Sequence, residues 1–285
     1  MKKLILLAIL LLTACATDTG VITQDVRTGT QGIQSKFAIY PTTVSPGERI
    51  AYTIEIRNEG ASDGEGTYTF TIDESAVSLL PQTTNKITLK GKDIFNQIGQ
   101  KEYLTFKAKT KELPPRKQSA QAQARFSTCY DYTTQATADV CIDTRPDQYP
   151  KACIPQVNTF LAGQGAPVAV QTIETRLIPM DKEHYFEPQF VITATNAGTG
   201  IVLAKGTRNP CTGQPTKRED YGIIGISAEM AGQQLICTPL KIETGKATCR
   251  LIKGIKEQAT YQSSITVKLE YGYFESIIQQ LTIEK

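Results

Sequence analysis

The chain has 285 residues, of which 40% are hydrophobic and 21% are charged, a globular composition long enough for two ordinary domains. The formal net charge of +3 includes Lys2 and Lys3. Without that pair, the 31 basic side chains fall to 29, against 28 acidic ones. No run of five like charges occurs, so we expect neither a nucleic-acid-binding stripe nor an electrostatic tail.

The N-terminus is typical of an export signal. Two lysines precede nine apolar residues at 4–12, which suits a signal peptide and is too short to span a bilayer. Leu-Thr-Ala-Cys at 12–15 resembles the lipobox of prokaryotic lipoproteins. The resemblance implies a signal peptide at 1–14 and a lipid on Cys15, where two acyl chains anchor stably. Ala14-Cys15-Ala16 also fits ordinary cleavage that releases a soluble protein, and an uncleaved anchor is the third alternative.

Residues 15–35 are polar and rich in Thr and Gly, and they lack a core pattern. We expect the lipidated cysteine to be followed here by a flexible tether. An added edge strand around Val21-Ile22 is the alternative.

The region 36–145 shows the alternation of a first β-sandwich. At 49–57, Ile50, Tyr52, Ile54 and Ile56 share one face and polar residues mostly take the other, which predicts a half-buried strand. Short strands between turn signals favour a sandwich or a barrel. Further strands are expected at 68–72, 87–89, 104–108, 120–132 and 138–143.

A second β-sandwich is predicted at 167–285, after a linker at 146–166 that is rich in Pro and Gly. Its expected strands lie at 168–176, 190–196, 201–203, 223–230, 233–237, 246–252, 261–271 and 275–283.

An internal repeat links the two regions. Residues 52–60 read YTIEIRNEG and residues 190–198 read FVITATNAG, so Asn58 matches Asn196 and Gly60 matches Gly198. We interpret these four residues as turn-forming: glycine tolerates positive φ, and the Asn side chain bonds the turning backbone. The repeat indicates one domain type used twice, and chance convergence of two strand ends is the alternative.

Residues 45–60, SPGERIAYTIEIRNEG, resemble the start of the CARDB-like family of immunoglobulin-like modules in prokaryotic surface proteins. Segments 28–32, 129–143 and 163–170 resemble archaeal surface lipoproteins of the same layout. The resemblance implies two tandem immunoglobulin-like antiparallel β-sandwiches outside the cell, with no catalytic residues.

Six cysteines remain beyond Cys15, and an even number in an exported protein predicts disulfides. Strand parity favours Cys129–Cys141 across a hairpin and Cys237–Cys249 between adjacent strands, which leaves Cys153–Cys211. Cys141–Cys153 is the main alternative. The chain has no C-x-x-C motif and one histidine, so no metal site is expected.

No catalytic set stands out. His184 lies in a polar stretch typical of an exposed hairpin tip, and a catalytic triad would have to use it. A calcium site among Asp63, Glu65, Asp73 and Glu74 fits no EF-hand spacing.

We therefore predict a non-enzymatic, lipid-anchored surface protein that needs no cofactor, is held at the membrane through Cys15 and binds a protein partner. A ligand-binding or accessory subunit of an envelope transport or secretion assembly is the alternative. A hydrolase using His184 or two carboxylates is a more distant one.

Overall fold

Three β-sheets build the part of the chain that the computed structural model describes, residues 26–80 and 84–285. Helical turns in these ranges are limited to α1 (Asn209–Thr212) and a 3-10 turn at Arg218–Asp220. Strand pairings are antiparallel, apart from a short parallel pairing of β2 with β19. The predicted all-β, antiparallel class is therefore confirmed. Among the described residues, no helix is long and apolar enough to cross a membrane.

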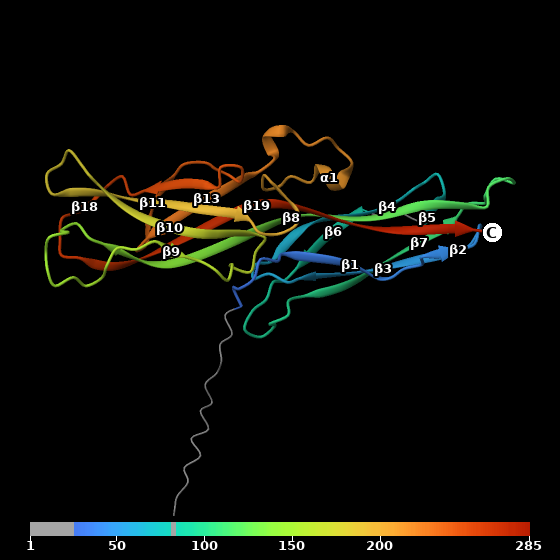
Figure 1. The fold of residues 1–285 in the computed structure, drawn as a ribbon, viewed down its shortest axis with the longest axis horizontal. Helices are drawn as coiled ribbons and strands as arrows, with labels where there is room; N and C mark the ends of the chain where they lie inside the picture. The colour runs from blue at the N-terminus through green and yellow to red at the C-terminus, as the bar shows by residue number, and fades with distance from the viewer. Residues whose placement is uncertain (1–25, 81–83) are drawn as a thin grey trace, which may run out of the picture.

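Two of the sheets lie in different halves of an elongated body, and the third runs through both (Figure 1). The four-stranded sheet has the order β1 (Ile33–Ile39), β3 (Arg49–Asn58), β7 (Lys101–Thr110) and β5 (Val77–Leu80). The six-stranded sheet contains β15 (Ile236–Cys237), β17 (Lys246–Arg250), β11 (Tyr185–Asn196), β10 (Val168–Pro179) and β9 (Asn158–Thr159), with β18 (Ile255–Lys256) beside β11.

The nine-stranded sheet has the order β14 (Gln233–Gln234), β13 (Ile223–Met230), β19 (Tyr261–Glu284), β8 (Ser119–Ile142), β4 (Gly64–Ile72) and β6 (Thr84–Leu89). Three short strands lie beside it: β2 (Thr43–Val44), β12 (Ile201–Leu203) and β16 (Leu240–Lys241).

The central feature is a two-stranded ribbon made of β8 and β19, each 24 residues long. They pair without a register shift from Ser119 opposite Glu284 to Ile142 opposite Tyr261. At about 3.4 Å per residue the ribbon is roughly 80 Å long. One end of it faces the four-stranded sheet and the other end faces the six-stranded sheet (Figure 1).

The ribbon differs from the sequence prediction, which divided each of these strands into two. Between 132 and 138 the alternation continues through the buried Thr134 and Ala136, with no turn-forming residue to interrupt it. Gly272 likewise stays in the strand, where an added Cβ would lie 2.7 Å from the carbonyl oxygen of Ala204.

The two halves therefore share the strands β8 and β19, and the sheets do not confirm two tandem immunoglobulin-like domains. Residues 272–284 of β19 pair with residues 119–131 of β8, inside the half that the sequence assigns to 36–145. The buried apolar residues form one cluster that continues through both halves.

The chain joins this body earlier than the tether prediction of 15–35 allows. β1 begins at Ile33, which is fully buried, and Gly29 already bridges Gly163. Cys15, the signal peptide and the alternative strand at Val21-Ile22 lie outside the described residues. The predicted linker 146–166 is also attached, because it contains β9 and ends at the buried Gln164 and Ala166.

Candidate functional site

The repeated Asn residues hydrogen-bond tyrosines at the middle of the ribbon, and the repeated Gly residues lie close to the same tyrosines. The Tyr132 hydroxyl donates to Asn58 Oδ1 at 2.9 Å, and the Tyr273 hydroxyl donates to Asn196 Oδ1 at the same distance. Each amide nitrogen then closes a loop, from Asn58 to the carbonyl of Ser62 and from Asn196 to the carbonyl of Gly200. In both copies of the repeat, therefore, the Asn side chain joins a ribbon tyrosine to the loop that follows the strand.

Gly60 and Gly198 are glycines for a different reason from the predicted one. Neither has positive φ. Instead, a Cβ would lie 2.0 Å from the Tyr132 hydroxyl at Gly60 and 2.4 Å from the Tyr273 hydroxyl at Gly198. Close approach of the tyrosine, and not backbone conformation, explains the absence of a side chain.

Two further tyrosines complete the symmetry. The Tyr130 hydroxyl accepts the amide of Ile33 at 3.1 Å, and the Tyr271 hydroxyl accepts the amide of Val168 at 3.2 Å. In the ribbon Tyr130 is opposite Tyr273 and Tyr132 is opposite Tyr271. Burial raises the pKa of all four phenols, so they remain neutral hydrogen-bonding groups.

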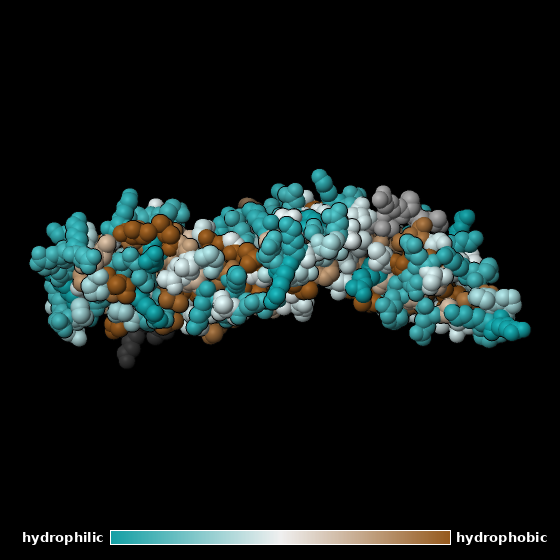
Figure 2. All heavy atoms as spheres, turned by 90° about the horizontal axis from the view of Figure 1, so that it is seen from above, coloured by the Kyte–Doolittle hydropathy of each residue, from teal (hydrophilic) through white to brown (hydrophobic). Residues whose placement is uncertain are grey.

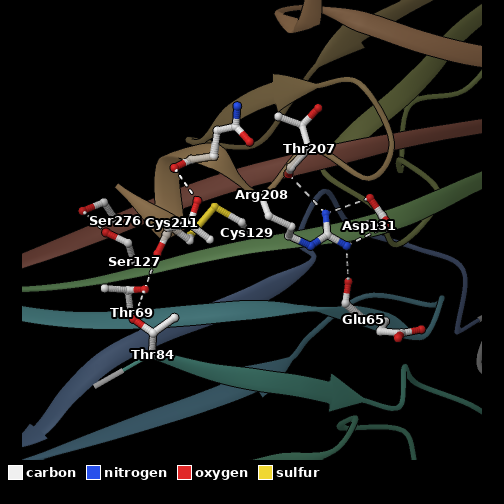
Figure 3. Close-up of a disulfide and its surroundings, with 12 residues drawn as sticks. Glu65, Thr69, Thr84, Ser127, Cys129, Asp131, Thr207, Arg208, Cys211 and Ser276 are labelled. Atoms are coloured by element: carbon white, nitrogen blue, oxygen red, sulfur yellow. Dashed lines mark hydrogen bonds and ion pairs between the residues drawn. A yellow bond between two sulfur atoms is a disulfide. The ribbon is translucent and has the colours of Figure 1, made fainter. Parts of the chain in front are cut away.

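The matching contacts place a pseudo-two-fold axis at the pair Asp131 and Gly272. One copy departs from the symmetry: β4 pairs with β8 as one strand, whereas β12 and β13 pair with β19 as two strands. The segment 204–222 between them carries α1 and reaches across the axis onto the other half (Figure 3).

Two polar anchors and a disulfide hold this segment (Figure 3). The Arg208 guanidinium donates to both Asp131 oxygens at 3.1 and 2.8 Å, and to the carbonyl of Glu65 at 3.1 Å. Cys211 is bonded to Cys129 on the outer face of β8. The Thr69 hydroxyl donates to the carbonyl of Cys211. Because Asp131 lies on the pseudo-two-fold axis, the segment clamps the junction of the two halves.

All six body cysteines form disulfides, but the predicted pairing is partly wrong. Cys237–Cys249 is present, and Cys129–Cys141 and Cys153–Cys211 are not. Cys129 and Cys141 lie twelve residues apart on the single strand β8, so their side chains cannot meet. Cys141 pairs with Cys153, the alternative from the sequence, and Cys129 pairs with Cys211.

A groove of about 290 Å³ lies on the inner side of the junction. It is bordered by Gln34 on β1, Thr128 on β8, Glu275 on β19 and the turn at Thr199. Phe126, Ile201 and Ile277 add apolar lining. It therefore combines apolar walls with a few polar groups, as small-ligand sites do.

Glu275 is the unusual group in this groove. Burial raises the pKa of its carboxyl to about 7, against an ordinary value of 4.5. The amide of Gln34 donates to both carboxyl oxygens at 3.3 Å, and Thr199 donates to one at 3.5 Å. At the symmetry-related place, Thr134 is fully buried and bonds Val168 and Tyr271. The second copy thus has the ionisable Glu275 where the first has Thr134, a neutral residue whose hydroxyl is buried and hydrogen-bonded.

Two hydroxyls beside Glu275 have unused hydrogen-bonding capacity. Thr128 is directly opposite Glu275 in the ribbon and is 1% exposed. Within the described ranges, Thr128 Oγ1 and Ser35 Oγ are buried and have no hydrogen-bond partner. A buried polar atom without a partner is costly, so a bound molecule or water that used both would be stabilised here.

The other candidates from the sequence do not assemble into a site. His184 is exposed in the turn between β10 and β11, where its Nδ1 contacts Glu257. The acidic candidates lie at opposite ends of β4: Asp63 accepts the amide of Gly91, and Asp73 accepts that of Ser75. No group of three or more His, Cys, Asp or Glu residues in the described part could hold a metal ion.

Comparison with known proteins identifies no family. No protein-family model matches the chain, and no curated protein matches it. The resemblance to CARDB-like modules therefore stays an interpretation of short motifs.

Proposed function

We propose that this protein is a non-enzymatic, lipid-anchored component of the cell surface whose stiff body binds a protein partner. The continuous ribbon of β8 and β19 carries the proposal, because it joins both halves without a hinge. Such a body suits holding a binding surface at a fixed place beside a membrane. On this proposal each half is a variant of an immunoglobulin-like sandwich.

Two observations support a location outside the cytoplasm. The structure contains three disulfides, which persist in oxidising compartments and are rare in the cytosol. Residues 1–15 have the pattern of an export signal and end in a lipobox-like Leu-Thr-Ala-Cys. Two acyl chains on Cys15 would give a stable anchor without a transmembrane helix.

The anchoring is tested by Cys15→Ser in the full chain. We expect the parent to sediment with membranes and the variant to appear in the soluble extracytoplasmic fraction. Cys237→Ser/Cys249→Ser is the matched control, because it also removes cysteine thiols but leaves Cys15, and it should stay on membranes. Equal membrane association of Cys15→Ser and the parent would contradict the anchor.

The partner is sought by crosslinking in intact envelopes. We expect one dominant crosslinked product, and we expect the same product when the two purified proteins are mixed. On gel filtration the mixture should elute as a complex with the summed mass of both proteins. Absence of any crosslinked species with the anchored parent would argue against a partner-binding role.

The junction groove favours a second candidate, a ligand-binding or accessory subunit of an envelope assembly. Its basis is the half-buried carboxyl of Glu275 beside the unpaired hydroxyls of Thr128 and Ser35. Small molecules extracted from the source cells should then raise the melting temperature of the parent. They should not raise that of Glu275→Gln, which lacks the carboxyl in the groove. If no extract component distinguishes the two proteins, the groove has no ligand role.

A further inference from the structure

Large apolar side chains are exposed on two neighbouring loops. The loop at 91–100 joins β6 to β7 and carries Ile94, Phe95 and Ile98, which are 64%, 91% and 66% exposed. Leu161, in the segment between β9 and β10, is 93% exposed. A fully exposed Phe flanked by exposed Ile is unfavourable in water, so such a group indicates an interaction site.

The 91–100 loop is held in a conformation that points its apolar residues outward. Asp93 Oδ1 accepts the amides of Phe95 and Asn96, both at 2.7 Å, and the Asp93 amide donates to the carbonyl of Asn96 at 3.0 Å. The base of the loop is fixed by the Lys92 amide, which donates to the carbonyl of Gly60 at 2.7 Å. A hydrogen-bonded turn therefore fixes the backbone at Phe95, whose side chain is exposed.

Both apolar loops adjoin the place where the chain enters the body. Ile98 and Lys92 line a shallow hollow with Gly29 and Gln31. The Gly29 amide donates to the carbonyl of Ala162, the residue after Leu161, at 2.7 Å. In Figure 1 the first described residues and the loop between β6 and β7 lie on the lower side of the body, opposite α1.

The length of chain before this entry point limits how far a membrane anchor could be. Eleven residue steps separate Cys15 from Val26. At no more than about 3.6 Å per residue, they reach at most roughly 40 Å. A lipid on Cys15 would therefore keep the entry side of the body close to the bilayer.

We propose that the apolar loop at 91–100, together with Leu161, docks on the lipid bilayer that holds the anchor. Phe95 and Ile94 enter the boundary between headgroups and acyl chains, and the flanking Lys90 and Lys92 face anionic headgroups. This inference rests on the proposed anchoring through Cys15. It adds a second, weaker membrane contact that fixes which side of the body faces the lipid.

The absence of tryptophan from the chain allows a clean test. Phe95→Trp places a single fluorescent reporter in the loop of the lipidated full chain. Ile278→Trp is the control, because Ile278 is 47% exposed on β19 and its neighbour Ile277 faces the groove, so its side chain is on the outer face of the ribbon. That face lies on the side of α1, which is the side shown in Figure 2.

Both variants are bound to vesicles of phosphatidylcholine with 30% phosphatidylglycerol, with and without brominated acyl chains. We expect the brominated lipid to reduce Phe95→Trp emission at least twofold. The emission of Ile278→Trp should change by no more than about a tenth of its value in vesicles without bromine. Addition of vesicles should also shift Phe95→Trp emission to shorter wavelength. Equal, weak quenching of the two reporters would overturn the docking.

Flotation of the same samples separates this inference from the anchoring. Anchored protein that floats with the vesicles but shows no quenching at residue 95 overturns the loop contact and leaves the anchor standing. Cys15→Ser that floats as well as the parent overturns the anchor, and quenching at residue 95 in that variant would show the loop binding lipid by itself. A parent that does not float overturns both.

Discussion

At the scale of single residues, two matched tyrosines make the same hydrogen bonds in different surroundings. Tyr132 bonds Asn58, which is fully buried, whereas Tyr273 bonds Asn196, which is exposed. We predict that Tyr132→Phe lowers the free energy of unfolding by about 1–3 kcal/mol, because Asn58 stays buried and water cannot replace the hydroxyl there.

Tyr273→Phe is the matched control for that substitution. Water can reach Asn196, so we expect a loss of less than about 1 kcal/mol. Urea unfolding of the three proteins measures both values. Equal losses in the two variants would show that burial of the asparagine does not set the cost.

Glu275 gives the stability a pH dependence. Its carboxyl has a pKa of about 7 in the folded protein, above the ordinary value of 4.5. Between those values the folded state holds the proton that the unfolded state has released, so stability falls as pH rises from about 4.5 to 7. We expect Glu275→Gln to be more stable than the parent by about 1–3 kcal/mol at pH 8, and equal to it at pH 4.

Glu270 provides the control for Glu275. Lys205 and Lys268 hydrogen-bond its carboxylate and hold its pKa below the ordinary value. Glu270→Gln should therefore show no gain in stability above pH 7. Denaturant unfolding at a series of pH values measures both variants, and a pH-independent difference for Glu275→Gln would contradict the assigned pKa.

At the scale of elements, the clamp segment 204–222 depends on one disulfide. Cys129–Cys211 closes 82 residues, and Cys237–Cys249 closes 12. On the chain-entropy account these loops contribute about 4–5 and about 3 kcal/mol, and the longer one also fixes α1 on the other half. We predict that Cys129→Ala/Cys211→Ala lowers the melting temperature more than Cys237→Ala/Cys249→Ala.

Limited proteolysis gives the element-scale prediction an independent measurement. In the Cys129→Ala/Cys211→Ala variant, new cleavage should appear within 204–222, where Arg208, Lys217 and Arg218 are trypsin sites. The other double variant should keep this segment resistant. Cleavage that is unchanged in both would mean that Arg208 and Asp131 hold the segment without the disulfide.

Patterns within one segment were enough to predict several elements. The alternation of Ile50, Tyr52, Ile54 and Ile56 predicts β3, because that period depends only on which face is buried. The pairing Cys129–Cys211 could not be predicted in this way, because it depends on an insertion that crosses from one half to the other.

One residue of the groove, Glu275, could have been noticed in the sequence, although its pattern is weak. Tyr271, Tyr273, Glu275 and Ile277 alternate on one face of β19, so a carboxylate stands at an inward position. A charged residue in an inward series indicates a polar site. Gln34 donates to this carboxylate and Thr128 lies opposite it in the ribbon. Both come from strands whose neighbours are set by the topology, which composition and spacing do not reveal.

At the scale of the whole molecule, the repeat and the ribbon describe one body made from two related halves. Each half places a sheet against one end of β8 and β19, and the tyrosine contacts repeat around the Asp131–Gly272 pair. Because each half is completed by a strand from the other, we expect the two halves to unfold together. Calorimetry should show one transition with equal van't Hoff and calorimetric enthalpies.

Shared strands also predict which fragment folds. Residues 26–132 contain the first sheet and half of β8, but they lack residues 272–284 of β19, including the fully buried Tyr273, Leu281 and Ile283. We predict that this fragment alone shows no cooperative unfolding. Without β19 it also exposes an unpaired edge of β8 and should aggregate.

The missing strand can be restored by a short hairpin. Tyr132 is directly opposite Tyr271, so a two-residue Asn-Gly turn can join residues 26–132 to residues 271–285 in the native register. This chimera should be monomeric and should unfold in one transition, because it regains the edge pairing and the buried side chains of β19. Cooperative folding of 26–132 without the added strand would show instead that the first half is an independent domain.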